Sequence, residues 1–424
     1  MKRRQFISRS AAGLAGSMVI PSIVKSGMMN ITSNNELPRF SMRALTHGPK
    51  HHFFGYYGMS PWNRSETTMV CLESSFQNRM PNPGEKATIG LVNPANGDFK
   101  PITDTDAWNL QQGSLIHWNP LNPDKEFIYN DRSGDNLESI SINIVTGNKT
   151  KLTRPISAVA EHGKYALSLT YGRLSRLRKV VGYANAVDPY EHEAHPKKDG
   201  VYLMDLKAGK NKLVVSIAEV FEKSVGGYPA LADRHMWFNH TVINPSATKF
   251  LFLARSKDKE KDLDSAMFTA NMDGSDLKMV IPFGSRVSHF GWRNDEEIIA
   301  TFYLNGRNEM NHILFNENKL DYRIVGENFL VGNGHCTYAH GGRFMATDFK
   351  DKATRSQSLW FYDMKIDQGL QLCSRPAYEK IYITGNMRCD FHPRWNPAGN
   401  KICFDAIDPA TKTRQMHLVE FLDI

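Results

Sequence analysis

Four histidines stand at one position of a short phrase that recurs in the second half of this 424-residue sequence. They are His240, His289, His335 and His392, and each precedes by five residues a turn position that holds proline, asparagine or histidine. A neutral imidazole can accept a proton or bind a transition metal, although a single histidine is more often a hydrogen-bonded structural residue. Packing alone gives no reason to select imidazole four times, so the recurrence favours a functional role.

The elements that must position these histidines are short strands. Strand-like sequence follows the turns, as in residues 249–254 and 401–404, and other strands end in Asn-Gly, Thr-Gly or Asp-Gly turns. Repetition of four short strands at a period of a few tens of residues is typical of a β-propeller. We therefore predict an all-β fold, a seven-bladed β-propeller over residues 37–424. Equivalent repeat positions form a ring about the channel, so the four imidazoles should converge.

Three further features complete the predicted architecture. Residues 38–45 alternate like a strand and should pair with the C-terminal blade to close the ring. We expect each blade to end at the strand with the Gly turn, which makes residues 359–364 the outer strand of the sixth blade. Residues 172–235 are longer than a repeat requires and contain a predicted helix at 217–223. This insertion either shapes a ligand pocket or forms a solvated surface loop.

The N-terminal segment is predicted to be a targeting signal. Arg3 and Arg4 are followed by a moderately apolar run at 11–20, the pattern of a twin-arginine export signal. We assign residues 1–30 to this signal and 31–36 to a linker, and predict a periplasmic or secreted protein. The run is short and rich in Gly and Ser, so no stable membrane insertion of the mature chain is expected, with an uncleaved anchor as the alternative.

Composition excludes several classes of protein. The formal net charge is +8, but five basic residues and no acid precede residue 30, so removal of the signal lowers it to +3. Without a long Lys/Arg stripe elsewhere, nucleic-acid binding is not predicted. The five cysteines are sparse and odd in number, which argues against a disulfide framework.

Several phrases resemble the bacterial β-propeller polysaccharide lyases, the group that includes oligogalacturonate lyase and the ulvan lyases. They extend over most of the predicted propeller: residues 51–57, 111–113, 238–240, 250–255, 334–336 and 392–395. The resemblance implies eliminative cleavage of a uronate glycan, hence an anionic polysaccharide or oligosaccharide as partner. One departure is that oligogalacturonate lyase uses a closely spaced His pair around one metal-binding turn, whereas these histidines are distributed one per blade.

The implied chemistry assigns roles to particular residues. A base must take the C5 proton, an acid must protonate the glycosidic oxygen, and a cation must neutralise the uronate carboxylate. His240 is the predicted base, Tyr56 the predicted acid and Arg255 the best candidate for the cation. The predicted substrate-binding residues are His52, Gln112, Arg173 and Arg394.

The remaining ring histidines are predicted to bind a divalent transition metal. His289, His335 and His392 would form a three-imidazole site for Zn or Mn, with Gln112 or Cys336 near enough to complete it. Whether this metal contacts the substrate or only holds the blades together stays open.

Two other functions stay open on the sequence. A non-catalytic binding propeller of the TolB type would keep the metal as a structural clip. A glycoside hydrolase would need a carboxylate pair, and Asp131 and Asp390 are equally consistent with turns.

Overall fold

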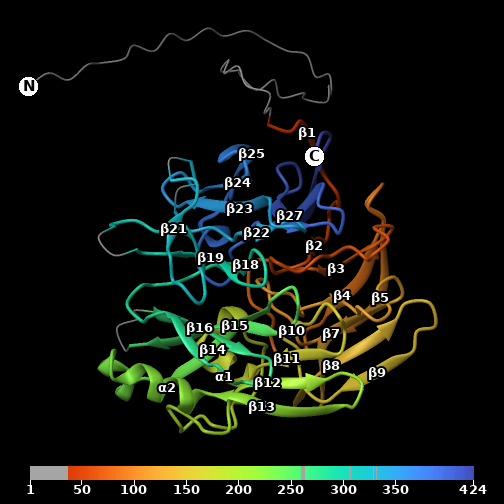
Figure 1. The fold of residues 1–424 in the computed structure, drawn as a ribbon. Coiled ribbons are helices and arrows are strands. Elements are labelled where there is room, and N and C mark those ends of the chain that lie inside the picture. The colour runs from red at the N-terminus through yellow and green to blue at the C-terminus, as the bar shows by residue number, and fades with distance from the viewer. Residues whose placement is uncertain (1–36, 259–262, 305–306, 328, 331) are drawn as a thin grey trace, which may run out of the picture. The chain divides into compact units, whose positions relative to one another are not determined.

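The fold was analysed in a computed structural model, which describes residues 37–424 apart from 259–262, 305–306, 328 and 331. The predicted export signal and linker, residues 1–36, lie outside the described residues. Within the described chain, seven four-stranded antiparallel sheets follow one another along the sequence. They form a seven-bladed β-propeller (Figure 1), which confirms the predicted fold class.

Each sheet runs outward from a short inner strand. The first three sheets consist of β2 (His51–Phe53), β3 (Met69–Ser74), β4 (Ala87–Val92) and β5 (Phe99–Thr105); β6 (His117–Trp118), β7 (Glu126–Ser133), β8 (Asn136–Asn143) and β9 (Lys149–Leu152); and β10 (Ala158–Val159), β11 (Tyr165–Ser168), β12 (Gly200–Asp205) and β13 (Lys210–Ser216). The next three consist of β14 (Met236–Ile243), β15 (Lys249–Lys257), β16 (Leu263–Asn271) and β17 (Lys278–Ile281); β18 (Phe290–Trp292), β19 (Glu297–Phe302), β20 (Asn311–Asn316) and β21 (Arg323–Ile324); and β22 (Thr337–Tyr338), β23 (Phe344–Asp351), β24 (Ser356–Asp363) and β25 (Gln368–Pro376).

The seventh sheet joins the two ends of the propeller. It contains β26 (Arg394–Trp395), β27 (Lys401–Ile407), β28 (Arg414–Phe421) and, at its outer edge, β1 (Phe40–Ala44). β1 pairs with β28 in an antiparallel register from Phe40 opposite Phe421 to Ala44 opposite His417. The predicted closure by the N-terminal strand is therefore confirmed. Backbone pairing between the chain's first and last strands leaves no gap in the ring.

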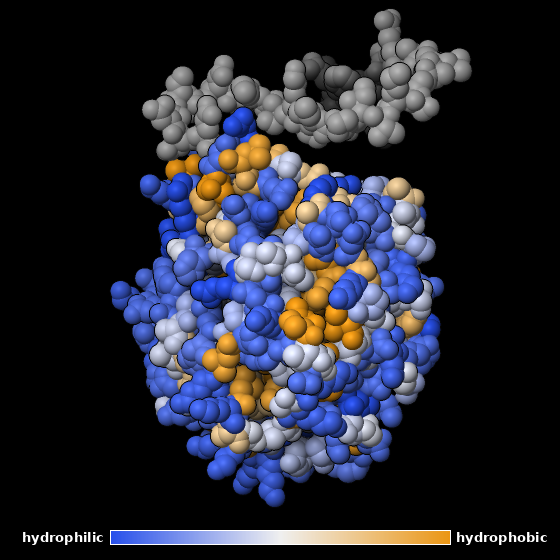
Figure 2. Space-filling view, turned by 90° about the vertical axis from the view of Figure 1, so that its right-hand side faces the viewer, coloured by the Kyte–Doolittle hydropathy of each residue, from blue (hydrophilic) through white to orange (hydrophobic). Residues whose placement is uncertain are grey.

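The sequence analysis ended the blades one strand too early. Residues 359–363 lie in β24, the third strand of the sixth blade, and β25 is the outer strand. In the first blade the Asn96-Gly97 turn likewise leads into a fourth strand, β5. These outer strands are largely polar because one side faces solvent, so they carry little apolar signal. Figure 2 shows that hydrophilic residues cover most of one face of the domain.

The hydrophobic core lies between neighbouring blades. In β15, Phe250 and Phe252 belong to a cluster that includes Leu167 of the third blade, whereas Leu251 and Leu253 pack in a cluster with the fifth blade. Successive side chains point to opposite faces of a strand, so a strand covered on both faces reads as a continuous apolar run. Burial of each such side chain contributes roughly 1.5–3 kcal/mol.

Most of the helical residues lie in two segments of the predicted insertion at residues 172–235. α1 (Tyr171–Leu177) and the 3₁₀ segment η1 (Lys179–Val181) lie inside the third blade, between β11 and β12, whereas α2 (Ile217–Val225) and the 3₁₀ segment η2 (Pro229–Asp233) lie between the third and fourth blades; η3 (Lys380–Tyr382) lies between β25 and β26. The predicted insertion therefore also contains β12 and β13, two strands of the third blade. The predicted helix at 217–223 is confirmed as α2. Ser216 and Glu219 form a capping box at its start, with each side chain bonded to the other's backbone N–H. No helix within the described residues is both long and apolar enough to cross a membrane.

Candidate functional site

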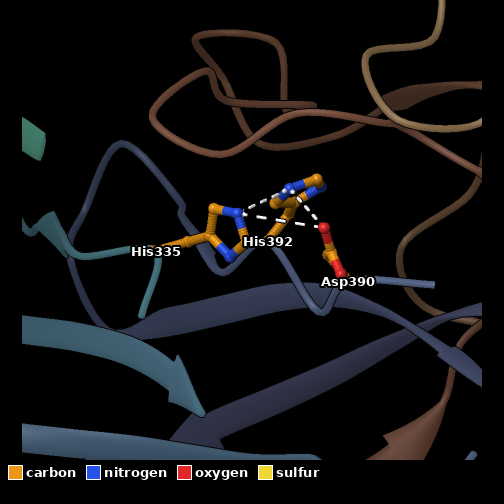
Figure 3. A group of neighbouring side chains, drawn as sticks. All are labelled: His335, Asp390 and His392. Carbon is orange, nitrogen blue, oxygen red and sulfur yellow. Dashed lines mark hydrogen bonds and ion pairs between the residues drawn. The ribbon is translucent and has the colours of Figure 1, made fainter. Parts of the chain in front are cut away.

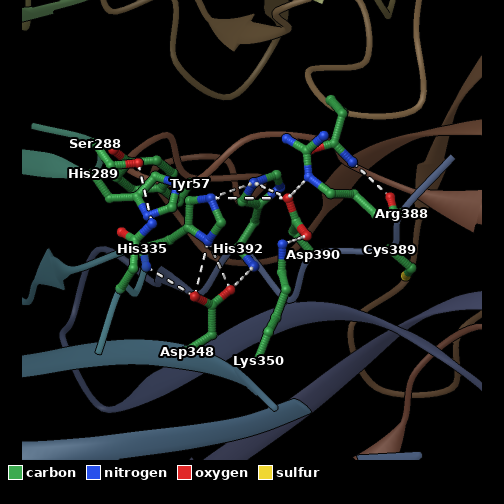
Figure 4. Close-up of polar contacts among 12 residues, drawn as sticks. Tyr57, Ser288, His289, His335, Asp348, Lys350, Arg388, Cys389, Asp390 and His392 are labelled. Carbon is green, nitrogen blue, oxygen red and sulfur yellow. Dashed lines mark hydrogen bonds and ion pairs between the residues drawn. The ribbon is translucent and has the colours of Figure 1, made fainter. Parts of the chain in front are cut away.

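The ring histidines converge in the structure. His289, His335 and His392 each lie directly before or within two residues of an innermost strand, in blades five, six and seven. The ring centroids of His289 and His335 are 3.7 Å apart, and those of His335 and His392 are 4.2 Å apart. Tyr57 packs against this group, with its ring centroid 5.0 Å from that of His335 (Figure 4). Equivalent repeat positions are therefore close in space, as the repeat reasoning predicted.

His240 joins the cluster from blade four through a bulge in β14. The pairing of β14 with β15 shifts register between Asn239 and Val242, and His240 adopts a positive φ of 59°. A bulge re-aims a side chain, and a left-handed residue other than glycine is costly and frequent at functional sites. The imidazole stacks on Tyr56, with centroids 4.8 Å apart and planes at 16°. The predicted base and acid are thus in contact.

The loop that carries Tyr56 is held by two features of its neighbours. Gly55 has a φ of 114°, and a Cβ there would lie 2.5 Å from the backbone of Gln112, so only glycine permits this approach. Arg394 is fully buried, pairs with Asp405 at 2.8 Å and donates to the carbonyl oxygens of Gly55 and Tyr56. Arg394 therefore positions the loop, and its donors are occupied by the protein rather than by a substrate.

Three ligand atoms that could hold a metal ion face one another deeper in the site (Figure 3). They come from His335, Asp390 and His392, all buried, and lie within 4.8 Å of one another. The Nε2 atoms of the two histidines are 3.2 Å apart. The Asp390 carboxylate oxygen is 3.7 Å from His392 Nε2 and 4.0 Å from His335 Nε2.

The protonation of these two histidines follows from their other ring nitrogens. His335 Nδ1 donates to the Asp348 carboxylate at 2.9 Å, and His392 Nδ1 donates to the carbonyl oxygen of Gly55. Each Nε2 therefore carries a lone pair, and burial keeps the pKa of both imidazoles well below the ordinary value. Two facing lone pairs repel unless a cation lies between them. The donor set, oriented by a carboxylate in the usual manner of metal-binding histidines, fits a divalent metal.

Asp390 is held in its ionised form by two cations. Burial alone would raise its pKa, but Lys350 and Arg388 outweigh burial and keep the pKa well below the ordinary value. Arg388 Nε donates to Asp390 at 2.8 Å, and Lys350 of β23 contacts the other carboxylate oxygen (Figure 4). A carboxylate that stays charged at all ordinary pH values is suited to a metal ligand.

The donor set differs from the predicted three-imidazole site. His289 lies beside His335 but contributes no atom to the facing group, and its Nδ1 has no hydrogen-bond partner among the described residues. Asp390 supplies the third ligand atom of the facing group. Cys336 is buried and also outside the group, and burial raises the pKa of its thiol to about 12. Gln112 contacts His240, with its Nε2 3.0 Å from Nδ1 of the imidazole.

The site has an outer and an inner layer. Tyr56, His240 and His289 are half-buried and reach solvent, whereas His335 and His392 behind them are each only 2% exposed. Burial lowers the pKa of His240 well below the ordinary value and raises that of Tyr56. The outer layer at neutral pH therefore consists of neutral imidazoles and a protonated phenol, which can accept and donate protons.

A guanidinium without a counter-ion among the described residues adjoins this outer layer. Arg255, on β15 opposite Trp237, is 6% exposed, and it makes no ion pair or side-chain hydrogen bond with any of the described residues. Burial, followed by the positive charge of Arg178, lowers its pKa to about 9. Arg255 thus remains a cation at neutral pH, and a buried cation without a partner is costly until an anion binds.

Two predicted substrate-binding residues have their polar atoms occupied elsewhere. Arg173, in α1, is 1% exposed and donates to the backbone carbonyls of the insertion and of Met236. His52 bonds to Gln415 and Glu73, each at 3.1 Å. Both side chains hold segments of the fold together. We assign them structural roles because no donor remains directed at the imidazole cluster.

Three residues of the site were not considered in the sequence analysis, and a fourth, Asp390, was considered only for a hydrolase carboxylate pair. Asp348 and Lys350 lie on β23, the second strand of its blade, and Arg388 and Asp390 lie in the segment before β26. None of them stands at a repeated position, so the repeat pattern carries no signal for them. The spacing of Asp390 and His392, two residues apart before a strand, is the one sequence feature that could have indicated a shared ligand turn.

Comparison with known proteins bears on the fold. No protein-family model matches the sequence, and no curated protein matches it significantly. An oligogalacturonate lyase solved in complex with manganese aligns with a TM-score of 0.64 and 14% identity, over 91% of this chain and 97% of that chain. The oligogalacturonate lyase of Vibrio parahaemolyticus aligns with a TM-score of 0.62 and 12% identity, over 90% of this chain and 94% of that chain.

A third solved structure is more distant. TolB from Acinetobacter baumannii aligns with a TM-score of 0.41 and 10% identity, over 84% of this chain and 80% of that chain, and carries no argument about function. At these identities the two lyases share the seven-bladed fold with this chain. Similarity at this level shows the fold and not the activity.

Proposed function

We propose that this chain is a carbon–oxygen lyase that cleaves a uronate-containing oligosaccharide or polysaccharide by β-elimination. The observation that carries the proposal is the contact between His240 and Tyr56, a neutral imidazole stacked on a protonated phenol 4.8 Å away, beside the unpaired cation Arg255. These are the base, the acid and the charge that the reaction needs. The similarity of the fold to two oligogalacturonate lyases supports the same class.

The two proton transfers follow from the protonation states. His240 takes the proton from C5 of the uronate, the electron pair forms the C4–C5 double bond, and the C4–oxygen bond breaks. Tyr56 gives its proton to the departing glycosidic oxygen. Burial holds the pKa of Tyr56 above that of an ordinary phenol, which keeps this proton in place until the oxygen develops charge.

Gln112 determines which nitrogen of His240 can act as the base. Its side-chain amide contacts Nδ1 at 3.0 Å. When the amide nitrogen faces the ring it donates to Nδ1, and the proton of the imidazole then resides on Nε2. When the amide is turned by half a rotation, its oxygen accepts from Nδ1–H and Nε2 keeps a free lone pair. Base catalysis requires the second arrangement, so Gln112 is a positioning residue.

The carboxylate of the substrate must be neutralised for the C5 proton to become acidic. Arg255 is suited to this because its guanidinium is charged, enclosed and without a protein partner among the described residues. An interaction between a carboxylate and a desolvated guanidinium is stronger than the same pair in water. We therefore propose Arg255 as the residue that binds the carboxylate of the scissile uronate.

His335, His392 and Asp390 would hold a divalent transition metal, Zn or Mn, directly behind these residues. When bound, the metal would supply a Lewis acid that withdraws charge from the substrate carboxylate. The residues around the two histidines orient both rings so that the Nε2 lone pairs point toward each other. Asp348 and the Gly55 carbonyl do this by accepting the Nδ1 protons.

A panel of uronate glycans tests the proposal. Purified protein with added Mn²⁺ or Zn²⁺ would be incubated with oligogalacturonate, ulvan, alginate and glycosaminoglycans while the ultraviolet absorbance of an unsaturated uronate is followed. We expect new absorbance on at least one glycan. New reducing ends without a double bond would indicate a hydrolase, and binding without any product would indicate a non-catalytic propeller.

We also propose export through the twin-arginine route, on the evidence of Arg3, Arg4 and the apolar run at 11–20. Export would place the enzyme in the periplasm or outside the cell, where anionic glycans are met. Intact mass of the protein recovered from periplasm should show an N-terminus beyond residue 20. Recovery of the full-length chain from the cytoplasm alone would contradict the proposal.

A further inference from the structure

Buried side chains anchor the segment that leads to Asp390. Residues 387–389 present three consecutive backbone carbonyls to them. Arg414 donates to the first two at 3.0 and 3.1 Å, and Gln357 of β24 donates to the third at 2.6 Å. Loop backbone is usually solvated, so three carbonyls bonded to enclosed side chains fix this segment firmly. The place of Asp390 in the site therefore depends on these donors.

The same guanidinium holds the loop at 109–113, which carries Gln112. Nη1 of Arg414 donates to the carbonyl oxygen of Leu110 at 2.6 Å. The loop is closed on itself, because its first and last residues exchange two backbone hydrogen bonds, at 3.0 and 3.1 Å. A displacement of Leu110 would therefore carry Gln112 with it, and the amide of Gln112 contacts the His240 imidazole.

A second link joins the two segments directly. Gln111 Nε2 donates to the carbonyl oxygen of Arg388 at 2.6 Å. The Arg388 side chain in turn donates from Nε to Asp390 at 2.8 Å (Figure 4). A continuous series of hydrogen bonds therefore runs from Asp390 to the loop that holds the partner of His240. Energetic coupling between two sites is carried by such networks and by the rigid elements that support them.

Arg414 is suited to bridge two segments. It is the first residue of β28, it is 1% exposed, and its own backbone N–H donates to His51 Nδ1 at 3.3 Å. A guanidinium offers five donors in one plane, so one side chain can reach carbonyls of both segments. An apolar residue of the same size would serve packing alone without the cost of burying a charge. The bridge gives a reason for the buried charge.

A second arginine of the same blade acts in a similar way. Arg394 of β26 donates to the carbonyl oxygens of Gly55 and Tyr56 and pairs with Asp405. Together, the two arginines of the blade that closes the ring hold three separate loops of the site. Arg414 differs because it joins two of these loops to each other.

We propose that Arg414 is a positioning residue that couples the proposed metal centre to the proposed base. Both of its Nη atoms are directed at backbone carbonyls rather than at the ligand atoms or the imidazole. It acts by keeping the segment with Asp390 and the loop with Gln112 at a fixed separation. This inference rests on the proposed lyase function and concerns how the two halves of the site stay in register. Loss of the bridge would loosen both halves at once.

Hydrogen–deuterium exchange of the metal-free protein tests the bridge without metal or substrate. The reporters are the backbone N–H groups of Gln112 and Cys389, each of which donates a hydrogen bond of 2.8 Å. We expect Arg414→Met to speed exchange of both by roughly 10-fold or more, because three carbonyls lose a charged donor. Arg414→Lys should show a smaller effect, since lysine keeps the charge but lacks the planar fork.

Arg173→Met is the matched control. Arg173 is also 1% exposed and bonded to backbone carbonyls, but to those of Met236 and of the loop at 190–194. We expect this variant to lose stability and to leave exchange at Gln112 and Cys389 unchanged. A gain in exchange that is equal in the two arginine variants would show general loosening of the fold and would overturn the bridge.

Metal affinity and kinetics then show whether the bridge serves the site. We expect Arg414→Met to weaken Mn²⁺ or Zn²⁺ binding roughly 10-fold, and Arg173→Met to bind as wild type does. On a glycan that wild type cleaves, Arg414→Met should lower kcat with little change in KM, because it removes no group that binds substrate. Arg414→Lys should recover part of both losses.

The outcomes separate the coupling from the lyase function. Wild-type metal affinity in a folded Arg414→Met protein, or faster exchange in only one of the two segments, would overturn the coupling. So would a wild-type protein that binds neither metal. A protein that cleaves no glycan would refute the lyase function, while exchange and metal titration still decide the bridge. If Arg414→Met does not fold, Arg414→Lys and Gln111→Met, which removes only the direct link, should show the same paired effects at smaller size.

Discussion

Asp348 offers a test of the proposed metal centre that leaves every ligand atom in place. This buried carboxylate on β23 accepts the backbone N–H of His335 at 2.8 Å, the Nδ1–H of the same residue at 2.9 Å and the backbone N–H of His392 at 3.2 Å. These three groups are all donors. Asp348→Asn keeps the shape of the side chain and replaces one acceptor oxygen with an NH₂ group.

The expected effect follows from the count of donors. Whichever way the asparagine turns, its NH₂ faces an N–H group of His335 or His392, so one buried donor loses its acceptor. That loss costs roughly 1–3 kcal/mol of folding free energy. To escape the clash, His335 can move its proton from Nδ1 to Nε2, which removes the lone pair that would bind metal. Loss of such a supporting carboxylate typically weakens metal binding about 10- to 100-fold.

The measurement is a Mn²⁺ or Zn²⁺ titration of metal-free protein, with metal content after gel filtration as a second readout. Asp363→Asn is the matched control. This residue lies on β24 of the same blade and is 4% exposed, but it pairs with Arg343 at 2.7 Å, away from the histidines. We expect the control to lose stability and keep its metal affinity. Wild-type metal affinity in a folded Asp348→Asn protein would refute the tautomer argument.

Two further predictions concern catalysis and pH. His240→Gln should abolish turnover while metal content and folding stay unchanged, and Tyr56→Phe should lower kcat more than it changes KM; retained activity would remove either residue from the mechanism. His417 is 1% exposed and packs on Phe404, and burial lowers its pKa to about 4. In the unfolded chain the pKa of His417 stays near 6.5, so protons bind the unfolded state first as the pH falls. The free energy of unfolding should therefore decrease by about 3 kcal/mol for this residue between about pH 6.5 and pH 4. Urea unfolding at several pH values should show His417→Gln with a correspondingly flatter dependence, and an identical dependence would contradict the reasoning.

The fold could be predicted because its repeated elements carry local signals. Turn glycines such as Gly97 recur in the first four blades, and apolar runs such as that of β15 mark the inner strands; each reflects a local constraint on φ or on burial. The outer strands were missed for the opposite reason. β25 is exposed along much of its length, so its polar sequence resembles a loop, and only pairing with β24 shows that it is a strand.

The histidines were found because they stand at a repeated position, whereas Asp348, Lys350 and Arg388 stand at none and were missed. Arg173 and Arg178 lie five residues apart on one short segment and are chemically identical. Backbone carbonyls of Met236 and of the loop at 190–194 saturate the first, whereas the second has no hydrogen-bond partner among the described residues. Which guanidinium is available depends on tertiary contacts, and no local sequence pattern encodes them.

The replacement of His289 by Asp390 in the donor set changes the chemistry that should be expected of the metal. Three neutral imidazoles would bind a borderline metal without compensating its charge. Two imidazoles with one carboxylate, held ionised by Lys350 and Arg388, compensate part of the charge and add a hard oxygen ligand. Hard ligands reduce the preference for Zn over Mn that nitrogen ligands create. We propose that a metal held by His335, His392 and Asp390 would act as a Lewis acid, because Lys350 and Arg388 offset part of the charge of Asp390 and would leave the metal more of its own.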